Sequence, residues 1–104
     1  MARKRPERTE RRAFERTLRH VVRDREKLAR LEAGGTAEHP IVVTSAAVIE
    51  VRVGALPCPQ CAGEYRLVEH EAPSAGLRAC HVTCRQCGVS RTLWFKIAPA
   101  DEPN

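Results

Sequence analysis

The sequence predicts a small α+β fold, in which an N-terminal amphipathic helix precedes an antiparallel β domain. Three observations lead to this prediction. Apolar residues recur at steps of three and four through residues 7–33, which is the period of an α-helix. Short β-branched segments then fill much of residues 41–97. Two Cys-x-x-Cys pairs lie in this second region, and a chain of 104 residues has room for one small domain and an appendage.

Residues 1–35 are expected to form a basic arm whose helix covers residues 7–33. Proline is tolerated in a first helical turn, where Pro6 stands, and Gly34-Gly35 provide a stop signal. Arg, Lys and Glu cover most of the helix surface, so it is expected to lie at the surface of the protein. Its single apolar stripe suits docking on a partner helix or a short coiled coil, and consists of Phe14, Leu18, Val21 and Leu28.

The net charge of +5 is concentrated in this arm. Residues 1–33 contain twelve basic and six acidic residues, a balance of +6, whereas residues 34–104 have a balance of −1. Arginines in such an arm could contact phosphates, although the interleaved acidic residues also fit a merely solvated face. The candidate nucleic-acid-binding residues are Arg3, Lys4, Arg5, Arg8, Arg12, Arg66, Arg85 and Arg91, with Tyr65 and Trp94 as stacking partners on the β domain.

Residues 36–54 are expected to be a linker followed by a β-strand segment. The linker over residues 36–40 is polar and ends in proline. Residues 41–44 and 47–53 are β-branched and apolar, and Ile49, Val51 and Val53 alternate with charged residues as in a half-buried strand.

Three further strands are expected over residues 64–70, 77–83 and 91–97. A turn through residues 72–76, which contain proline and glycine, joins the first two. Residues 98–104 are expected to form a flexible tail.

The two Cys-x-x-Cys pairs predict a metal site made of Cys58, Cys61, Cys84 and Cys87. The pairs are separated by 22 residues, and each pair can present two sulfurs to one ion from one side. Four thiolates complete a tetrahedron, so we expect one structural Zn²⁺ and no catalysis at the metal. Gly63 and Gly88 are expected to supply positive φ, and backbone N–H groups of the turns are expected to point at the thiolates.

Residues 55–97 resemble a zinc ribbon, through Cys-Pro-x-Cys, a hairpin, Cys-x-x-Cys-Gly and a third strand. Zinc ribbons occur in transcription factors, RNA polymerase subunits, ribosomal proteins and small bacterial proteins, so the resemblance implies a fold and a metal rather than one function. It covers under half of the chain, and residues 1–54 resemble no named family. Iron in a rubredoxin-like site uses the same four cysteines and remains an alternative, which the low aromatic content of 4% disfavours.

Other interpretations of these residues are weaker. A thioredoxin-like dithiol at Cys58 and Cys61 would need a βαβ setting, which the sequence lacks. Disulfides are rare in a reducing compartment. Cys80 is expected to be a small buried hydrophobe rather than a spare ligand or redox switch. His70 and His81 are expected to be surface histidines, with a role as alternate ligands left open.

The functional prediction is a non-enzymatic, zinc-stabilised binding module. Nucleic acid is the first expected partner, and a protein partner or self-assembly through the helix is the alternative; an iron redox protein is the remaining one. No nucleophile with a His and acidic pair and no Gly-rich phosphate loop is present in the sequence. We expect a cytoplasmic protein without a signal peptide, a membrane span or a small-molecule substrate. The oligomeric state is left open.

Overall fold

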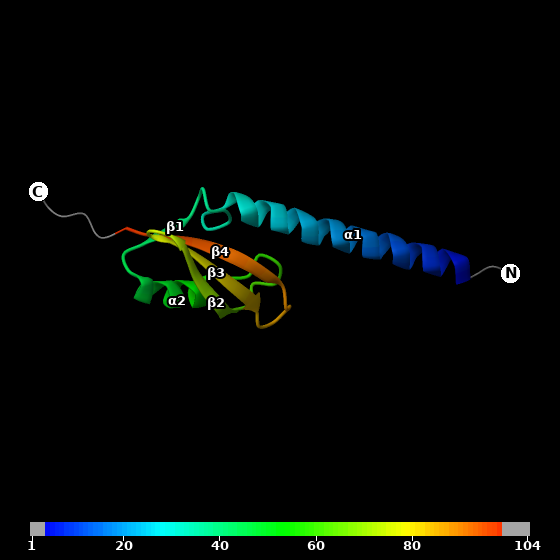
Figure 1. Cartoon of the computed structure of the whole chain (residues 1–104). Helices are drawn as coiled ribbons and strands as arrows, with labels where there is room; N and C mark the ends of the chain where they lie inside the picture. The colour runs from blue at the N-terminus through cyan, green and yellow to red at the C-terminus, as the bar shows by residue number, and fades with distance from the viewer. Residues whose placement is uncertain (1–3, 99–104) are drawn as a thin grey trace, which may run out of the picture.

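The computed structural model describes residues 4–98, which form two helices and four strands (Figure 1). Arg3 lies outside the described residues, as do residues 99–104 of the tail expected over 98–104 and the side chains of Lys4 and Arg5. The predicted α+β class is confirmed, because a long N-terminal helix precedes a mostly antiparallel sheet. The elements in chain order are α1 (Lys4–Leu31), β1 (Ile41–Val43), α2 (Ala46–Ala55), β2 (Tyr65–Ser74), β3 (Leu77–Cys84) and β4 (Ser90–Ile97).

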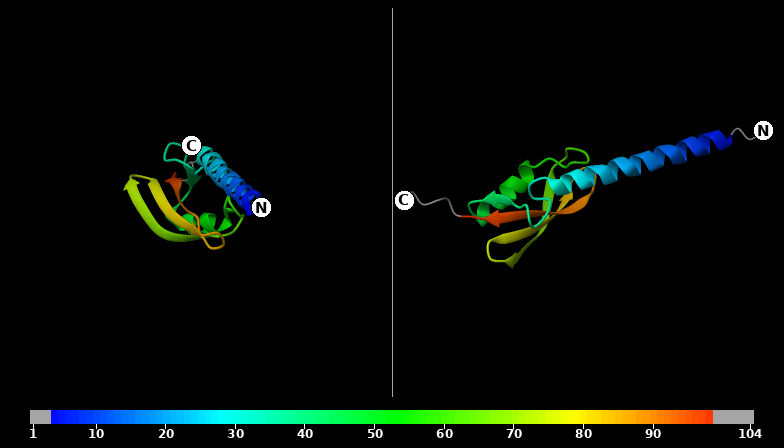
Figure 2. Two further views of the ribbon diagram at one scale, coloured as in Figure 1. Left: turned by 90° about the vertical axis from the view of Figure 1, so that its right-hand side faces the viewer. Right: turned by 90° about the horizontal axis from the view of Figure 1, so that it is seen from above.

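Helix α1 projects from the body for most of its 28 residues (Figures 1 and 2). It ends at the expected glycines, where Gly34 adopts a φ of +89° and the N–H of Gly35 donates to the carbonyl of Glu32 at 2.9 Å. The N–H of Trp94 donates to the carbonyl of Gly34 at 2.8 Å, which ties the end of the helix to β4. Within residues 4–98, no helix has the length and the hydrophobicity that a membrane crossing requires.

The four strands form one sheet in the order β1-β4-β3-β2. The β2–β3 and β3–β4 pairs are antiparallel, as the three expected strands require, and strand β2 continues to Ser74 beyond its expected end at residue 70. Strand β1 pairs with β4 in parallel, with Ile41 opposite Phe95 and Val43 opposite Ile97. This parallel pair places the chain that follows α1 on the outer edge of the sheet.

The strand expected over residues 47–53 is wrong, because this segment lies within helix α2. Ile49 and Val53 are four residues apart and therefore share one face of the helix, where their exposed fractions are 0% and 1%. Val51, which the strand prediction placed on the same side, is 71% exposed. The apolar residues of this segment fit both the two-residue period of a strand and the four-residue spacing of a helix. The helix forms because it buries Ile49 and Val53 against the apolar face of the sheet.

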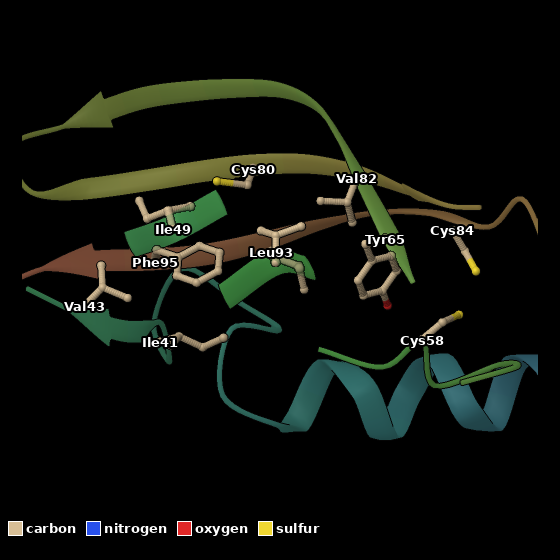
Figure 3. Close-up of a cluster of buried hydrophobic side chains, with 11 residues drawn as sticks. Ile41, Val43, Ile49, Cys58, Tyr65, Cys80, Val82, Cys84, Leu93 and Phe95 are labelled. Carbon is tan, nitrogen blue, oxygen red and sulfur yellow. The ribbon is translucent and has the colours of Figure 1, made fainter. Parts of the chain in front are cut away.

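The core lies between α2 and one face of the sheet (Figure 3). Phe95 at its centre is fully buried, and Ile49, Val53 and Val82 pack around it. Cys80 also lies in this core with an exposed fraction of 0%, so the prediction of a small buried hydrophobe is confirmed. Burial raises the pKa of the Cys80 thiol, which keeps it protonated and unreactive.

Candidate metal centre

The four predicted cysteines converge at one end of the sheet. Cys58 and Cys61 lie in the loop between α2 and β2, whereas Cys84 ends β3 and Cys87 lies in the turn before β4. Their sulfur atoms all lie within 4.8 Å of one another. The Sγ atoms of Cys58 and Cys87 are 3.8 Å apart, and those of Cys61 and Cys84 are 3.4 Å apart. Each close pair joins the two turns across the site.

These sulfur distances fit a tetrahedral metal ion. A Zn–S bond of about 2.3 Å gives a sulfur–sulfur edge of about 3.8 Å in a regular tetrahedron. A disulfide would need about 2.05 Å, which is far shorter than either sulfur pair described above. All four cysteines are free, so the cluster could hold a metal ion with four sulfur ligands. The geometry does not distinguish zinc from iron.

The two Cys-x-x-Cys turns have the same backbone conformation. The N–H of Ala62 donates to the carbonyl of Cys58 at 2.7 Å, and the N–H of Gly88 donates to the carbonyl of Cys84 at 3.1 Å. The donor residue has positive φ in both turns, +64° at Ala62 and +81° at Gly88. The prediction for Gly88 is therefore confirmed, but in the first turn Ala62, and not Gly63, adopts the left-handed conformation.

Gly63 is needed for space rather than for its φ. A Cβ atom at this position would lie 2.8 Å from Cβ of Gln86, 3.0 Å from Sγ of Cys84 and 3.1 Å from Sγ of Cys61. The two turns can approach each other this closely only because the residue between them has no side chain.

Backbone N–H groups point at the sulfur atoms, as the sequence predicts. Gln60 donates to Sγ of Cys58 at 3.4 Å, and Gly63 donates to Sγ of Cys61 at 3.3 Å. In the second turn, Gln86 donates to Sγ of Cys84 at 3.3 Å. These hydrogen bonds stabilise thiolates, so they offset part of the negative charge that four metal-bound sulfurs would bring.

The pKa values of the thiols diverge within the cluster. The backbone N–H of Cys87 lowers the pKa of Cys84 to about 6, with a further contribution from the N–H of Gln86. Desolvation raises the pKa of Cys61 to about 12, and hydrogen bonding to Cys84 adds to this rise. One thiol of the metal-free cluster is therefore ionised at neutral pH, and another must lose its proton when a metal binds.

Tyr65 adds a second layer to the site. Its ring is buried, and its hydroxyl group points toward Cys58 without forming a hydrogen bond (Figure 3). Burial raises the pKa of the Tyr65 hydroxyl, which therefore keeps its proton and remains a donor. A metal-bound thiolate at Cys58 would give this unpaired donor an acceptor. Tyr65 was expected on an exposed stacking surface, and its burial beside the cysteines corrects that expectation.

The expected nucleic-acid surface on the β domain is not assembled. Tyr65 is buried and Trp94 is half-buried. The side chain of Arg91 is only 10% exposed and pairs with Glu26 of α1. Arg66 and Arg85 are exposed, and Arg85 lies 3.9 Å from a carboxylate oxygen of Glu64. The β domain therefore presents isolated arginines rather than a stacking platform.

Helix α1 instead gathers seven of its basic residues on one face, whereas Arg11 and Arg25 lie outside that face among acidic residues. A basic stripe follows steps of 4, 4, 3, 4, 4 and 3 residues, which keep its members on one side at about 100° per residue. Glu26 lies at the margin of this stripe and faces the body, and the other acidic residues of α1 lie outside it. All members of the stripe are exposed, and they are Arg8, Arg12, Arg16, Arg19, Arg23, Lys27 and Arg30.

The predicted apolar stripe of α1 is exposed as well. Phe14 and Leu28 are 63% and 60% exposed, and Leu18 and Val21 are also accessible. The apolar stripe and the basic stripe lie on different sides of the helix. At about 100° per residue, Phe14 and Leu18 are rotated by about 120° and 80° from the nearest basic-stripe position. The apolar stripe therefore does not pack on the body of its own chain.

His81 lies on the sheet and not in the cysteine cluster. Its Nε2 atom is 2.7 Å from a carboxylate oxygen of Glu71, and its Nδ1 atom is 2.9 Å from the hydroxyl of Thr92. Glu69 lies close to this pair. Both ring nitrogens of His81 are therefore within hydrogen-bonding distance of side chains on the neighbouring strands β2 and β4.

Comparison of the chain with protein-family models, with curated proteins and with solved structures finds no match. The chain is thus a small α+β protein with a zinc-ribbon-like pair of turns and a four-cysteine cluster that could hold a metal ion.

Proposed function

We propose that the protein is a non-enzymatic, zinc-stabilised module that binds double-stranded nucleic acid through the basic stripe of α1. The observation that carries this proposal is the alignment of seven exposed basic residues on one face of a helix that projects from the body. A solvated helix without a polyanionic partner has no need to collect seven basic residues on one side. We place this function in a reducing cytoplasm, where the cysteines stay available for the metal.

Zinc is the metal that we propose for the cysteine cluster. Cys58, Cys61, Cys84 and Cys87 would hold it, and it would supply structural stabilisation with no open coordination position. Such an ion contributes about 10–16 kcal/mol of apparent binding free energy in small domains, which is comparable to the whole stability of a domain. Iron in the same site is the alternative, and elemental analysis of the purified protein distinguishes the two metals.

The dimensions of the basic stripe suit a duplex. Arg8 and Arg30 are separated by 22 residues of helix, or about 33 Å, which is close to the length of one turn of B-DNA. Single-strand binders combine positive charge with exposed aromatic rings on which bases stack. The only aromatic residue of α1 is Phe14, and it lies outside the stripe. Helix α1 lacks Asn and Gln, the residues that read adenine, so any base preference would come from its arginines through guanine. We expect most of the contacts to go to phosphates.

Fluorescence anisotropy at several salt concentrations tests this proposal. If all seven basic residues neutralise phosphates, the logarithm of the affinity falls against the logarithm of the salt concentration with a slope approaching about −6. We expect tighter binding to a duplex than to single strands of equal length. Absent binding, or binding that does not depend on salt, would contradict the proposal.

Two neighbouring arginines provide a matched pair of variants. Arg12→Glu reverses a charge within the basic stripe, whereas Arg11→Glu makes the same change outside it. We expect Arg12→Glu to weaken duplex binding, and to make the salt slope less steep by about 1 because one fewer phosphate is neutralised. Arg11→Glu should have a much smaller effect. Equal losses in both variants would mean that net charge, and not the stripe, governs binding.

The exposed apolar stripe favours a second candidate, an interaction with a partner helix or a second copy of the chain. Leu18 lies at its centre, so Leu18→Asp should disrupt such a complex. Analytical ultracentrifugation at several protein concentrations tests self-assembly. A monomer at every concentration, in the parent protein as in the variant, would exclude the second copy as the partner.

A further inference from the structure

The last turns of α1 are attached to the body at the first Cys-x-x-Cys turn, through Gln60. The Nε2 atom of Gln60 donates to the carbonyl of Val22 at 2.9 Å and to a carboxylate oxygen of Glu26 at 2.7 Å. The backbone carbonyl of Gln60 accepts a hydrogen bond from Nη1 of Arg25 at 3.0 Å. One residue between two metal-binding cysteines thus contacts three residues of α1.

Glu26 connects the same contact to the sheet. Its carboxylate pairs with Arg91 of β4, whose side chain is nine-tenths buried. The guanidinium of Arg91 lies over the ring of Tyr65, 5.8 Å from its centroid, and the hydroxyl of Tyr65 points toward Cys58 (Figure 3). A second path therefore runs from α1 through the body and back to a metal-binding cysteine.

We propose that Gln60 is a positioning residue through which the metal centre sets the direction of α1. Ala62 of the Gln60 turn has a left-handed φ of +64°, which is unfavourable for a non-glycine residue and persists only where its surroundings restrain the chain. Cys58 and Cys61 would provide that restraint when both bind one metal ion. A metal bound to the cysteines would fix the conformation of this turn. It would thereby fix the carbonyl and the side-chain amide of Gln60, which form the hydrogen bonds to α1. The coupling is reciprocal, so docking of α1 also strengthens metal binding.

This inference rests on the proposed function in one respect. A fixed helix holds the basic stripe at one angle to the sheet, whereas a released helix would present the same charges on a mobile arm. Metal loss would then lower the affinity for a duplex without removing a single basic residue, because ordering the arm would cost conformational entropy on binding.

The second Cys-x-x-Cys turn provides a matched control. Gln86 occupies the same position in Cys84-Arg85-Gln86-Cys87 that Gln60 occupies in the first turn, and its backbone N–H makes the equivalent bond to a cysteine sulfur. Its side chain is exposed and forms no hydrogen bond to α1 in the part of the chain that the structure describes. Gln60→Ala and Gln86→Ala therefore make the same chemical change at equivalent positions, and only the first removes two side-chain hydrogen bonds to α1.

Amide hydrogen exchange of the zinc-loaded full chain tests the inference. Native mass spectrometry first confirms one zinc per chain in the parent and in both variants. We expect exchange in residues 22–31 to be about tenfold faster in Gln60→Ala than in the parent, since two side-chain hydrogen bonds are lost. Gln86→Ala should match the parent. Residues 7–18, which do not contact the body, should exchange equally in all three proteins.

Competition with a zinc chelator provides the reciprocal measurement. We expect Gln60→Ala to bind zinc about tenfold more weakly than Gln86→Ala, by the same coupling. Equal exchange and equal zinc affinity in the two variants would overturn the inference. Neither measurement contains nucleic acid, so a parent protein that fails to bind a duplex would contradict the proposed function alone. A parent that binds a duplex while both variants behave alike would contradict this inference alone.

Discussion

Substituting Gly63 with alanine should disturb the metal centre directly. The added methyl group would meet Cβ of Gln86 at 2.8 Å and Sγ of Cys84 at 3.0 Å. Neither atom is the free end of a flexible side chain, so the two Cys-x-x-Cys turns would have to move apart. Gly88→Ala is the control, because a Cβ at Gly88 has no atom within 4 Å and costs only the left-handed conformation.

The expected loss of metal affinity follows from the steric strain that the added methyl group introduces. Adding a methyl group to a fully packed site costs about 1–3 kcal/mol, which corresponds to an about 5- to 150-fold loss of metal affinity. A left-handed alanine at position 88 costs about 1–2 kcal/mol and can weaken metal binding too, because folding and metal binding are coupled. Affinity alone therefore does not separate the two variants, and the geometry of the site must be measured as well.

Absorption spectroscopy of the cobalt-substituted proteins provides that measurement. Visible absorption of Co²⁺ bound to four thiolates depends on the geometry of the tetrahedron. We expect a changed spectrum in Gly63→Ala and an unchanged spectrum in Gly88→Ala, with affinities taken from chelator competition on the same samples. A Gly63→Ala protein with the parent spectrum and the parent affinity would refute the argument that this glycine is needed for space.

Three further predictions concern the same site. Ala62→Gly should raise the free energy of unfolding by about 1 kcal/mol, because glycine adopts positive φ without strain, and thermal unfolding of the zinc-loaded protein measures this gain. Tyr65→Phe should weaken zinc binding about tenfold in chelator competition, because it removes the hydroxyl that can donate to Cys58 while keeping the ring. Zinc affinity should fall at least tenfold per pH unit between about pH 8 and pH 6, because the thiol of Cys61, with its pKa raised to about 12, must release a proton to bind. An affinity independent of pH would contradict the assignment of Cys61 as a ligand.

Local sequence patterns predicted the parts of the fold that depend on neighbouring residues. The glycines after α1 mark its end, the turn residues mark the hairpin, and the spacing of the four cysteines indicates their cluster. Each of these signals is contained in a short stretch of chain. The basic stripe was also open to discovery from the sequence, because steps of three and four residues from Arg8 to Arg30 are visible once a helix is expected.

Contacts between distant segments explain what the sequence did not predict. Residues 47–53 fit the hydrophobic pattern of a strand and that of a helix. They form α2 because the helix buries Ile49 and Val53 in one core with Phe95 of the sheet. Arg91 was expected at the surface, but it forms a partly buried ion pair with Glu26, which lies 65 residues earlier in the chain. Gly63 was expected to supply positive φ, but it is needed because Gln86 and Cys84 of the other turn leave no space for a side chain. None of these contacts has a local signature.

Native mass spectrometry of the untagged protein, combined with elemental analysis before and after treatment with a strong chelator, determines whether the four cysteines hold a metal that the fold needs. We expect one zinc per chain, and loss of the folded state when the chelator removes it. The same spectra report any bound nucleic acid and the oligomeric state. A chain that carries no metal and remains folded would mean that the four cysteines are not a structural metal site, because the clustered thiols would then need no ion to hold them together.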